Sequence, residues 1–395
     1  MKPEYLDVIK LLRSAVTGEK LSLSPDFSIA QAQDILKHHG VQTMGYMGAI
    51  NCGVPKTEAV MQQLFVSYMR GAAVSQRQLA AAEKLFGRFE EKGIDYLPLK
   101  GLVMKKLYPY PELRPMGDGD ILIRIEQYPE IQEIMINLGY QEKQEADHEL
   151  PWIGPGLYVE LHKRLVPTVD PDLFSYYGDG WKFAKKSSGS RYCMSDEDFF
   201  IFLFAHFAKH FRGGGIGCRH VVDLFVYRNT HPEMDESYIL TQLKALCLDA
   251  FYQNMLSVLD AWFFDKPYNA CADFITQRIF DNGIWGTAEN QYIAESLRTT
   301  ADTDSMGRGR WKLLMKRLFL NLEEMQYRYP VLVKHKYLLP VFWIWRLMEL
   351  PFKKSHVVSR RISLLRKESE NRILQRKKEL EYVGFYNAFQ DESRR

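Results

Sequence analysis

Residues 113–123 read LRPMGDGDILI, and the fold prediction starts from this stretch. If Asp118 to Ile123 form a strand, successive side chains alternate between the two faces of a sheet. Asp118 and Asp120 then project together, while Ile121 and Ile123 turn to the opposite, packed face. Two carboxylates that share a small volume raise each other's pKa unless a cation compensates, and a hard divalent ion such as Mg²⁺ accepts oxygen ligands of this kind. A solvated turn is the alternative interpretation of a bare Asp-x-Asp.

A second expected strand supplies a third carboxylate. Residues 157–162 read LYVELH, so Glu160 and His162 share a face. If this strand lies beside the first, Glu160 completes a cluster of three carboxylates that could hold one or two metal ions. Such ions bridge nucleotide phosphates, neutralise developing charge and align an attacking oxygen. The pattern therefore suits phosphoryl or nucleotidyl transfer in general.

The surrounding periodicity predicts an α+β protein. A helical lead-in ends near Gly93 and includes a long amphipathic segment over residues 56–91. Short strand-like runs then alternate with helical stretches, and from Ser195, which begins a capping-box pattern, the chain is mainly helical. We expect four parts: residues 1–93, an N-terminal helical segment; 94–194, the sheet-containing part; 195–352, a helical acceptor-binding region; and 353–395, a basic helical tail.

The composition is that of an ordinary globular protein, with 46% hydrophobic and 26% charged residues among 395. The five cysteines are scattered and form no Cys-x-x-Cys pair, so neither a disulfide framework nor a zinc knuckle is expected. The first residues lack the pattern of a signal peptide, and residues 337–352 are interrupted by charges and prolines. A cytoplasmic protein is therefore expected.

Basic residues are concentrated in residues 353–378, which hold ten Lys or Arg against two Glu. The run is typical of a solvated basic helix. The preceding aromatic residues 342–345 are most simply core, but together with the basic run they could rest on an anionic membrane surface. Nucleic acid is the other anionic partner considered.

Four motifs together resemble a known family. They are Leu99-Lys100-Gly101, residues 114–120 (RPMGDGD), Gly139-Tyr140 and residues 159–162 (VELH). In order and spacing they resemble the polymerase-β-type nucleotidyltransferase superfamily and, within it, a group of uncharacterised bacterial nucleotidyltransferases. The resemblance covers about residues 94–165, with a fainter continuation through His206, His210, Arg219 and Asp223.

The resemblance implies a nucleotidyltransferase-like mixed-sheet palm, flanked by an N-terminal helical segment and a larger C-terminal helical region. Asp118 and Asp120 would bind the catalytic Mg²⁺ or Mn²⁺, with Glu160 as the third acidic position or as a base for the acceptor hydroxyl. Gly101 would begin a helix near the nucleotide phosphates. The implied reaction transfers a nucleoside monophosphate from a nucleoside triphosphate such as ATP to an acceptor and releases pyrophosphate. The sequence indicates neither the acceptor nor the oligomeric state.

Seven further side chains are candidates for a role in the site, each with an alternative. Lys100 could carry positive charge to a triphosphate or be a surface lysine, and Arg114 could contact phosphate or pair with a neighbour such as Glu112. His206 and His210 share one helix face and could contact substrate, form a packed pair, or bind zinc with His220 or Asp223. The same alternatives apply to Asp147, His148 and His162, with His162 favoured because it shares a face with Glu160.

Two departures from the superfamily pattern favour a second hypothesis. Lys100-Gly101 stands where the superfamily usually has Gly-Ser or Gly-Gly, and Gly119 replaces an apolar residue between the two acids. A glycine there costs roughly 0.5 to 1 kcal/mol in an element interior. The alternative function is an inactive nucleotide- or partner-binding module of the same fold, associated with a membrane or nucleic acid through its basic tail.

Overall fold

The structure, a computed structural model, describes residues 1–145, 148–168, 170–283, 319, 322, 325–326, 329, 331–353 and 370–385. The chain divides into two compact units, one formed by residues 1–211 and 215–285 and the other by residues 212–214 and 286–395. Every site residue predicted from the sequence lies in the first unit. The described helices of the second unit are α16 (Val331–Lys334), α17 (Leu339–Lys353) and α19 (Glu370–Tyr382). Residues 354–369 of the predicted basic tail lie outside the described residues.

A mixed seven-stranded sheet forms the centre of the first unit. Its strands are β1 (Tyr96–Pro98), β2 (Asp118–Ile123), β3 (Gln141–Glu142), β4 (Glu149–Ile153), β5 (Tyr158–His162), β6 (Lys185–Ser188) and β7 (Arg191–Cys193). They lie in the order β3-β4-β5-β2-β1-β7-β6. The strand β2 pairs in parallel with β5 and antiparallel with β1, so the Asp-x-Asp stretch occupies the middle of the sheet. The predicted α+β class is confirmed.

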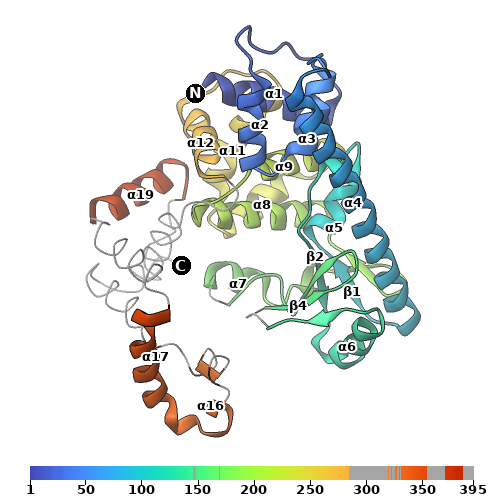
Figure 1. Ribbon diagram of the computed structural model, residues 1–395, viewed down its shortest axis with the longest axis vertical. Helices are drawn as coiled ribbons and strands as arrows, with labels where there is room; N and C mark the ends of the chain where they lie inside the picture. Colours follow the sequence, from blue (N-terminus) through green and yellow to red (C-terminus); the bar gives the residue numbers. More distant parts are fainter. Residues whose placement is uncertain are drawn as a thin grey trace. The chain divides into compact units, whose positions relative to one another are not determined.

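Four helices precede the sheet in the chain, and the last of them packs against one face of it. They are α1 (Pro3–Thr17), α2 (Ile29–His38), α3 (Gln42–Asn51) and α4 (Ala59–Lys92). Figure 1 shows α4 running from α3 along the sheet towards α6 (Tyr128–Asn137). Leu85 and Phe89 of α4 are fully buried in a core cluster that includes Ile121, Ile123 and Leu161. Because these strand residues alternate with Asp120 and Glu160, the acidic side chains lie on the opposite face.

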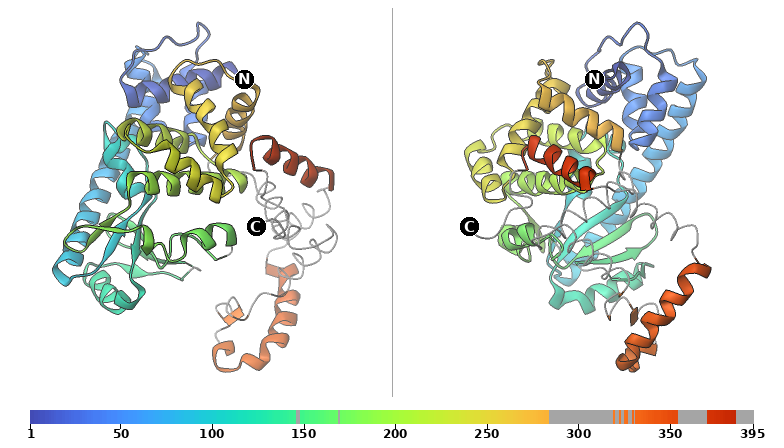
Figure 2. Two further views of the ribbon diagram at one scale, coloured as in Figure 1. Left: turned by 180° about the vertical axis from the view of Figure 1, so that it is seen from behind. Right: turned by 90° about the vertical axis from the view of Figure 1, so that its left-hand side faces the viewer.

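Six described α-helices of the first unit follow β5 in the chain, and the one after Ser195 begins where the capping pattern predicts. They are α7 (Pro171–Tyr177), α8 (Asp196–Arg212), α9 (Cys218–Thr230), α10 (Glu236–Ala245), α11 (Asp249–Phe263) and α12 (Ala270–Asn282). The Ser195 hydroxyl accepts the backbone N–H of Asp198 at 3.1 Å, which satisfies one of the first amides of α8. The views of Figure 2 show α8 between the N-terminal helices and the sheet, and α9 contacts α1 and α11.

The sequence predicts β1, β2 and β5 but not the outer strands. Two of the missed strands, β3 and β6, consist of exposed polar residues that carry no alternating pattern. The strand β4 contains Pro151, a residue that argues against an interior strand. This omission matters because β4 pairs with β5 and places a further acidic residue beside Glu160.

Among the described residues, no helix combines the length and the apolar character that a membrane crossing requires.

Candidate active site

Strand register brings the acidic residues together on one face of the sheet. Asp120 lies opposite Glu160 in the parallel pair β2–β5, and His162 lies opposite Leu122. On the other side of β5, Glu149 of β4 lies opposite His162. Side chains at directly opposed positions are neighbours on the same face. The strand pairing on which the candidate role of Glu160 depends is therefore confirmed.

Asp120 is the buried centre of the site, with a side chain only 4% exposed. Its Oδ1 accepts hydrogen bonds from Lys100 Nζ at 2.7 Å and from His162 Nε2 at 2.9 Å. Burial alone would raise the pKa of Asp120, but the Lys100 charge and the contact with His162 outweigh it and lower that pKa well below its usual range. Asp120 is therefore ionised at neutral pH.

Lys100 reaches Asp120 from an unfavourable backbone conformation. It lies at the start of the short helix α5 (Lys100–Met104) with a φ of 38°, in the left-handed region that favours glycine. A glycine, which the superfamily pattern usually has at this position, would adopt this conformation without steric cost. Burial lowers the pKa of Lys100, but the charges of Asp120, Asp118 and Glu160 act more strongly and raise it. The ammonium group therefore stays charged. Its ion pair with Asp120 offsets the free-energy cost of the left-handed backbone at Lys100.

Among the described residues, Asp118 and Glu160 have no ion pair as short as that of Asp120, and Glu160 lies 3.9 Å from His162 Nε2. Burial and the charge of Asp120 raise the pKa of Asp118 above its ordinary value. Burial, together with the charges of Asp118, Glu149 and Asp120, raises the pKa of Glu160 to about 8. Glu160 is therefore mostly protonated at neutral pH in the protein without an added cation. Crowded carboxylates of this kind are the oxygen donors that a divalent ion accepts.

Gly119 fits the packing rather than weakening it. A Cβ atom at this position would lie 3.0 Å from Leu157 Cδ2 and 3.3 Å from Leu102 Cδ1. Leu157 and Leu102 belong to the core cluster beneath the sheet. Neighbouring leucines therefore fill the space that an apolar residue takes in the superfamily pattern.

Three side chains hold the segment that leads into β2. Asp223 of α9 accepts hydrogen bonds from Arg114 Nε at 2.9 Å and Nη2 at 3.1 Å, and one from Tyr108 at 2.8 Å. Arg219, one turn earlier on α9, donates to the carbonyl of Pro115 at 2.8 Å. On the other side, Gln78 of α4 donates to the carbonyl of Met116 at 2.8 Å. These bonds fix the backbone immediately before Asp118.

In the structure Arg114 pairs with Asp223, whereas the sequence suggested phosphate or a neighbour such as Glu112 as its partner. Its guanidinium is 4% exposed and paired with Asp223, while Glu112 accepts a hydrogen bond from Tyr68. A Cβ on Gly101 would lie 2.5 Å from Met116 Sδ and 2.9 Å from Arg114 Nη1. The absence of a side chain at Gly101 thus allows this segment to pack closely against α5.

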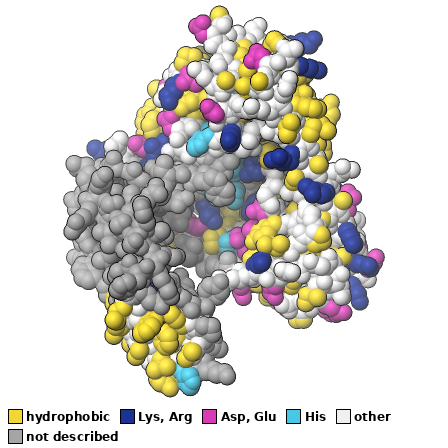
Figure 3. All heavy atoms as spheres, viewed as in Figure 1, with side chains coloured by type: hydrophobic (Ala, Val, Ile, Leu, Met, Phe, Trp, Pro, Cys, Tyr) yellow, Lys and Arg dark blue, Asp and Glu magenta, His cyan; other side chains and the backbone are white. Residues whose placement is uncertain are grey.

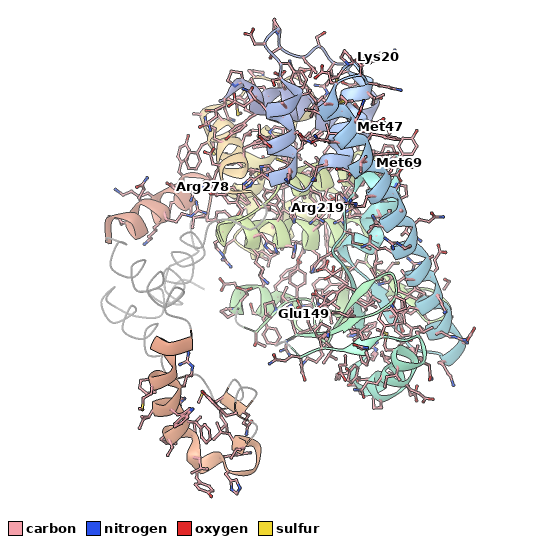
Figure 4. The ribbon with its side chains drawn as sticks, viewed as in Figure 1. Lys20, Met47, Met69, Glu149, Arg219 and Arg278 are labelled. Atoms are coloured by element: carbon pink, nitrogen blue, oxygen red, sulfur yellow. The ribbon has the colours of Figure 1, made fainter. Side chains whose placement is uncertain are left out.

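Three histidines of α8 and α9 lie close to one another, and the charge of Lys100 acts on two of them, His206 and His210. The ring centroids of His206 and His210 are 4.4 Å apart, and those of His206 and His220 are 6.3 Å apart. Burial and the charge of Lys100 lower the pKa of His206. Figure 3 shows acidic, basic and histidine side chains close together on this part of the first unit. In Figure 4 the labelled Arg219 lies in the helical part and Glu149 at the sheet.

In the part of the chain that the structure describes, two sets of three residues have potential metal-ligating atoms within 4.8 Å of one another. One is Asp120, Glu160 and His162, and the other is His148, Glu149 and His162. Neither includes Asp118, His206 or His210. Asp147, which the sequence also singled out, lies outside the described residues.

The sequence did not point to Glu149 as a site residue. The residue precedes a segment containing Pro151, and only the register of β4 on β5 places it beside His162.

Residues 25–264 match the family described as uncharacterised nucleotidyltransferase, which covers well over half of the chain. The chain belongs to this family. The match contains the whole sheet and all the acidic and histidine residues described above. Membership of this nucleotidyltransferase family supports a nucleotidyl-transfer function. Nucleotidyltransferases generally use divalent metals, and Asp120 and Glu160 offer carboxylate oxygens of the kind that such an ion accepts.

A solution structure of the antibiotic-resistance factor ANT(2'')-Ia is also similar to part of this nucleotidyltransferase. The two are 13% identical, the alignment covers 47% of this chain and 97% of that chain, and the TM-score is 0.32. This similarity is too low to inform the function. No curated protein matches the chain.

Proposed function

We propose that this protein transfers a nucleoside monophosphate from a nucleoside triphosphate to an acceptor and releases pyrophosphate. The observation that carries the proposal is the parallel register of β2 and β5, which sets Asp120 directly opposite Glu160 with Asp118 on the same face. Family membership gives the reaction class. The three carboxylates would hold Mg²⁺ or Mn²⁺.

Bound there, the ion would neutralise charge on the triphosphate and help to align the attacking oxygen with the α-phosphorus. Asp120, ionised and held by Lys100 and His162, is the fixed ligand. Glu160, whose pKa is raised to about 8, completes the site or accepts the proton of an acceptor hydroxyl.

The cationic side chains around the carboxylates would bind the triphosphate. Lys100 remains charged, and Arg219 lies close enough to Asp118 for its charge to offset part of the rise in the pKa of that carboxyl. Arg114, engaged with Asp223, supports the Asp-x-Asp segment. We keep direct phosphate contact by Arg114 and Gly101 as a prediction to be tested by substitution.

The acceptor pocket would be formed by the helical region that follows the palm. His206 and His210 of α8 and His220 of α9 present ring nitrogens near Lys100 and Arg219. Imidazoles suit hydrogen bonding to hydroxyl or phosphate groups of an acceptor. Apart from Arg219, this division assigns nucleotide chemistry to residues 94–194 and acceptor recognition to the helices after Ser195.

The test is pyrophosphate release from labelled nucleoside triphosphates, with Mg²⁺ or Mn²⁺ and cell extract as the source of acceptor. The double variant Asp118→Asn, Asp120→Asn should lose release by about 100-fold or more, because transition-state charge stabilisation is removed. Glu126→Gln, an exposed acid on the same palm, is the matched control and should behave as wild type. Equal release by the double variant and wild type would exclude the proposal.

The ion pair between Lys100 and Asp120 favours one alternative, a nucleotide- or partner-binding module without catalysis. The Lys100 ammonium already contacts Asp120 Oδ1, an oxygen that would otherwise ligate the metal. Calorimetry separates the two functions, since nucleotide binding that is indifferent to divalent metal supports the module and strengthening by metal supports the enzyme.

The basic tail, residues 353–378, would associate with an anionic membrane surface or with nucleic acid and make this cytoplasmic protein peripheral to the membrane. In the helix before it, α17, the side chains of Val341, Ile344, Trp345 and Met348 are exposed. Pull-downs with anionic liposomes and with RNA should lose signal when the chain ends at Leu350. Unchanged binding by the shortened chain would exclude a role for the tail.

A further inference from the structure

A second group of possible metal ligands lies beside the carboxylates, and two of its three members have no part in the proposed reaction. It consists of His148, Glu149 and His162, whose ligating atoms lie within 4.8 Å of one another. Register explains the grouping, because Glu149 at the start of β4 lies directly opposite His162 at the end of β5. His148 immediately precedes Glu149, and its ring lies edge-on to that of His162 with centroids 5.4 Å apart.

The hydrogen bonding of His162 leaves one ring nitrogen free to ligate. Its side chain is 0% exposed, and Nε2 lies 2.9 Å from Asp120 Oδ1. An ionised carboxylate only accepts hydrogen bonds, so Nε2 carries the proton in this contact. The other nitrogen, Nδ1, is buried and has no hydrogen-bond partner in the described chain. A proton on Nδ1 would leave a buried donor without an acceptor, so Nδ1 presents a lone pair.

His148 contacts another member of the group, Glu149. Its Nε2 lies 2.9 Å from Glu149 Oε1, and its Nδ1 is buried without a partner among the described residues. An ion that replaces the proton between His148 Nε2 and Glu149 Oε1 would be ligated by both groups, with His162 Nδ1 as the third ligand. His162 would then have the arrangement of a histidine metal ligand, because its second nitrogen is oriented by the carboxylate of Asp120.

We propose that His148, Glu149 and His162 form a second metal site that binds a divalent transition metal of the zinc class. Two imidazoles and one carboxylate are a donor set that zinc uses when a fourth position stays open to water or substrate. Mg²⁺ prefers oxygen ligands and suits Asp118, Asp120 and Glu160 instead. Zinc bonds of about 2.0 to 2.2 Å place tetrahedral ligands about 3.4 Å apart, so small side-chain rotations suffice to close the group.

Such an ion would position Asp120 through His162. With Nδ1 of His162 coordinated, its Nε2–H is directed at Asp120 and cannot rotate away. The second site would therefore act on the same carboxylate that Lys100 contacts. The inference needs no nucleotidyl transfer and can be tested on a protein that has no substrate.

The experiment uses the metal-stripped, full-length protein titrated with Co²⁺, whose visible absorption reports nitrogen ligation. In the presence of millimolar Mg²⁺, one Co²⁺ per chain should bind and give the absorption of a low-coordinate, nitrogen-ligated ion. His148→Ala and Glu149→Gln should each weaken Co²⁺ binding by at least ~10-fold. Losses of metal affinity of about this size follow the removal of groups that orient a metal ligand, and removal of a ligand itself should cost no less. His148→Cys should restore binding and add a sulfur-to-metal absorption band, because thiolate also ligates this ion.

His38→Ala is the matched control, since His38 is an exposed histidine of α2, and it should bind Co²⁺ as wild type does. Circular dichroism of each variant separates loss of the site from loss of folding. Co²⁺ bound with wild-type affinity and spectrum by folded His148→Ala would overturn the proposal. Complete displacement of Co²⁺ by millimolar Mg²⁺ would do the same, because it would place both ions at Asp118, Asp120 and Glu160.

Discussion

Asp120 Oδ1 accepts hydrogen bonds from both Lys100 and His162. A cation that binds this oxygen therefore competes with the Lys100 ammonium group. The contact is short, 2.7 Å between Lys100 Nζ and Asp120 Oδ1, and it lies in a buried setting where charge interactions are strong. The lysine therefore both fixes the carboxylate and limits its access to metal.

Replacing Lys100 with methionine should strengthen Mg²⁺ binding roughly threefold or more, because removing a nearby positive charge favours another cation at the same carboxylates. Isothermal calorimetry measures the dissociation constant. Lys106→Met, at an exposed neighbouring lysine, should leave it unchanged. Weaker Mg²⁺ binding by Lys100→Met would show that the ammonium organises the site instead of competing for it.

The raised pKa of Glu160 predicts that metal affinity depends on pH. Because this pKa is about 8 in the protein without added cation, the carboxyl is protonated below pH 8 and must release its proton to ligate. The apparent affinity for Mg²⁺ should therefore rise about tenfold per pH unit up to about pH 8 and then level off. Calorimetry between pH 6 and pH 9 checks this, and a flat profile for wild type would contradict it. Glu160→Gln should bind weakly and without this slope.

At the scale of elements, two interactions fix the strand β2. Leucines pack closely against Gly119 on its core face, and hydrogen bonds and an ion pair from α9 hold the segment that precedes it. Leu102 and Leu157 fill the space below Gly119, and α9 binds the segment before Asp118 through Asp223 and Arg219. Both features fix where the acidic side chains point.

Gly119→Ala should lower the free energy of unfolding by about 1 to 3 kcal/mol, because its new Cβ would lie 3.0 Å from Leu157 in a filled core. Denaturant unfolding measures the change. The control Gly87→Ala lies in α4 with nothing within 4 Å of an added Cβ, so it should be neutral or stabilising. Adding Leu157→Ala to Gly119→Ala should cost less than the sum of the two single changes, and strict additivity would exclude this contact as the cause.

The buried pair of Arg114 and Asp223 should be the strongest link between α9 and the sheet. Asp223→Ala leaves a guanidinium that is 4% exposed without its partner, so it should cost about 3 to 5 kcal/mol of unfolding free energy. The double variant Arg114→Met, Asp223→Leu should recover most of that loss, since no uncompensated charge remains. If Asp223→Ala unfolded like wild type, the pair would not hold this segment.

At the scale of the whole molecule, the first unit contains every candidate site residue. Its N-terminal residues contact α12, the last helix described in this unit. The amino group of Met1 lies 3.3 Å from Asp273, and Tyr5 donates to Asp281 at 2.8 Å. These contacts join α1 to α12, so the first unit is closed by interactions between its first and last described helices.

A shortened chain of residues 1–285 should therefore unfold in one cooperative transition and keep its response to ligand. Binding to the folded state raises stability in proportion to the logarithm of ligand concentration over the dissociation constant. ATP with Mg²⁺ should accordingly raise the Tm of the shortened chain and of the full chain by similar amounts. A response confined to the full chain would show that the second unit takes part in the site.

The sequence by itself determined the palm and its acidic face. A two-residue period places Asp118 with Asp120 and Glu160 with His162 whatever the rest of the chain does, because strand side chains alternate. The helical period of residues 56–91 and the capping residues at Ser195 are likewise local properties. These features follow from neighbours in the chain, and the structure has them as predicted.

Only the tertiary structure decided which partners the site residues have. Nothing local to Arg114 points to Asp223, 109 residues away, and nothing in the residues around Pro151 indicates the strand that brings Glu149 to His162. The sequence around Gly119 likewise predicts weaker strand packing. In the structure Leu157 and Leu102 fill the space that a side chain at this position would occupy. Burial, charge compensation and close packing depend on distances between segments far apart in the chain, and the folded structure sets those distances.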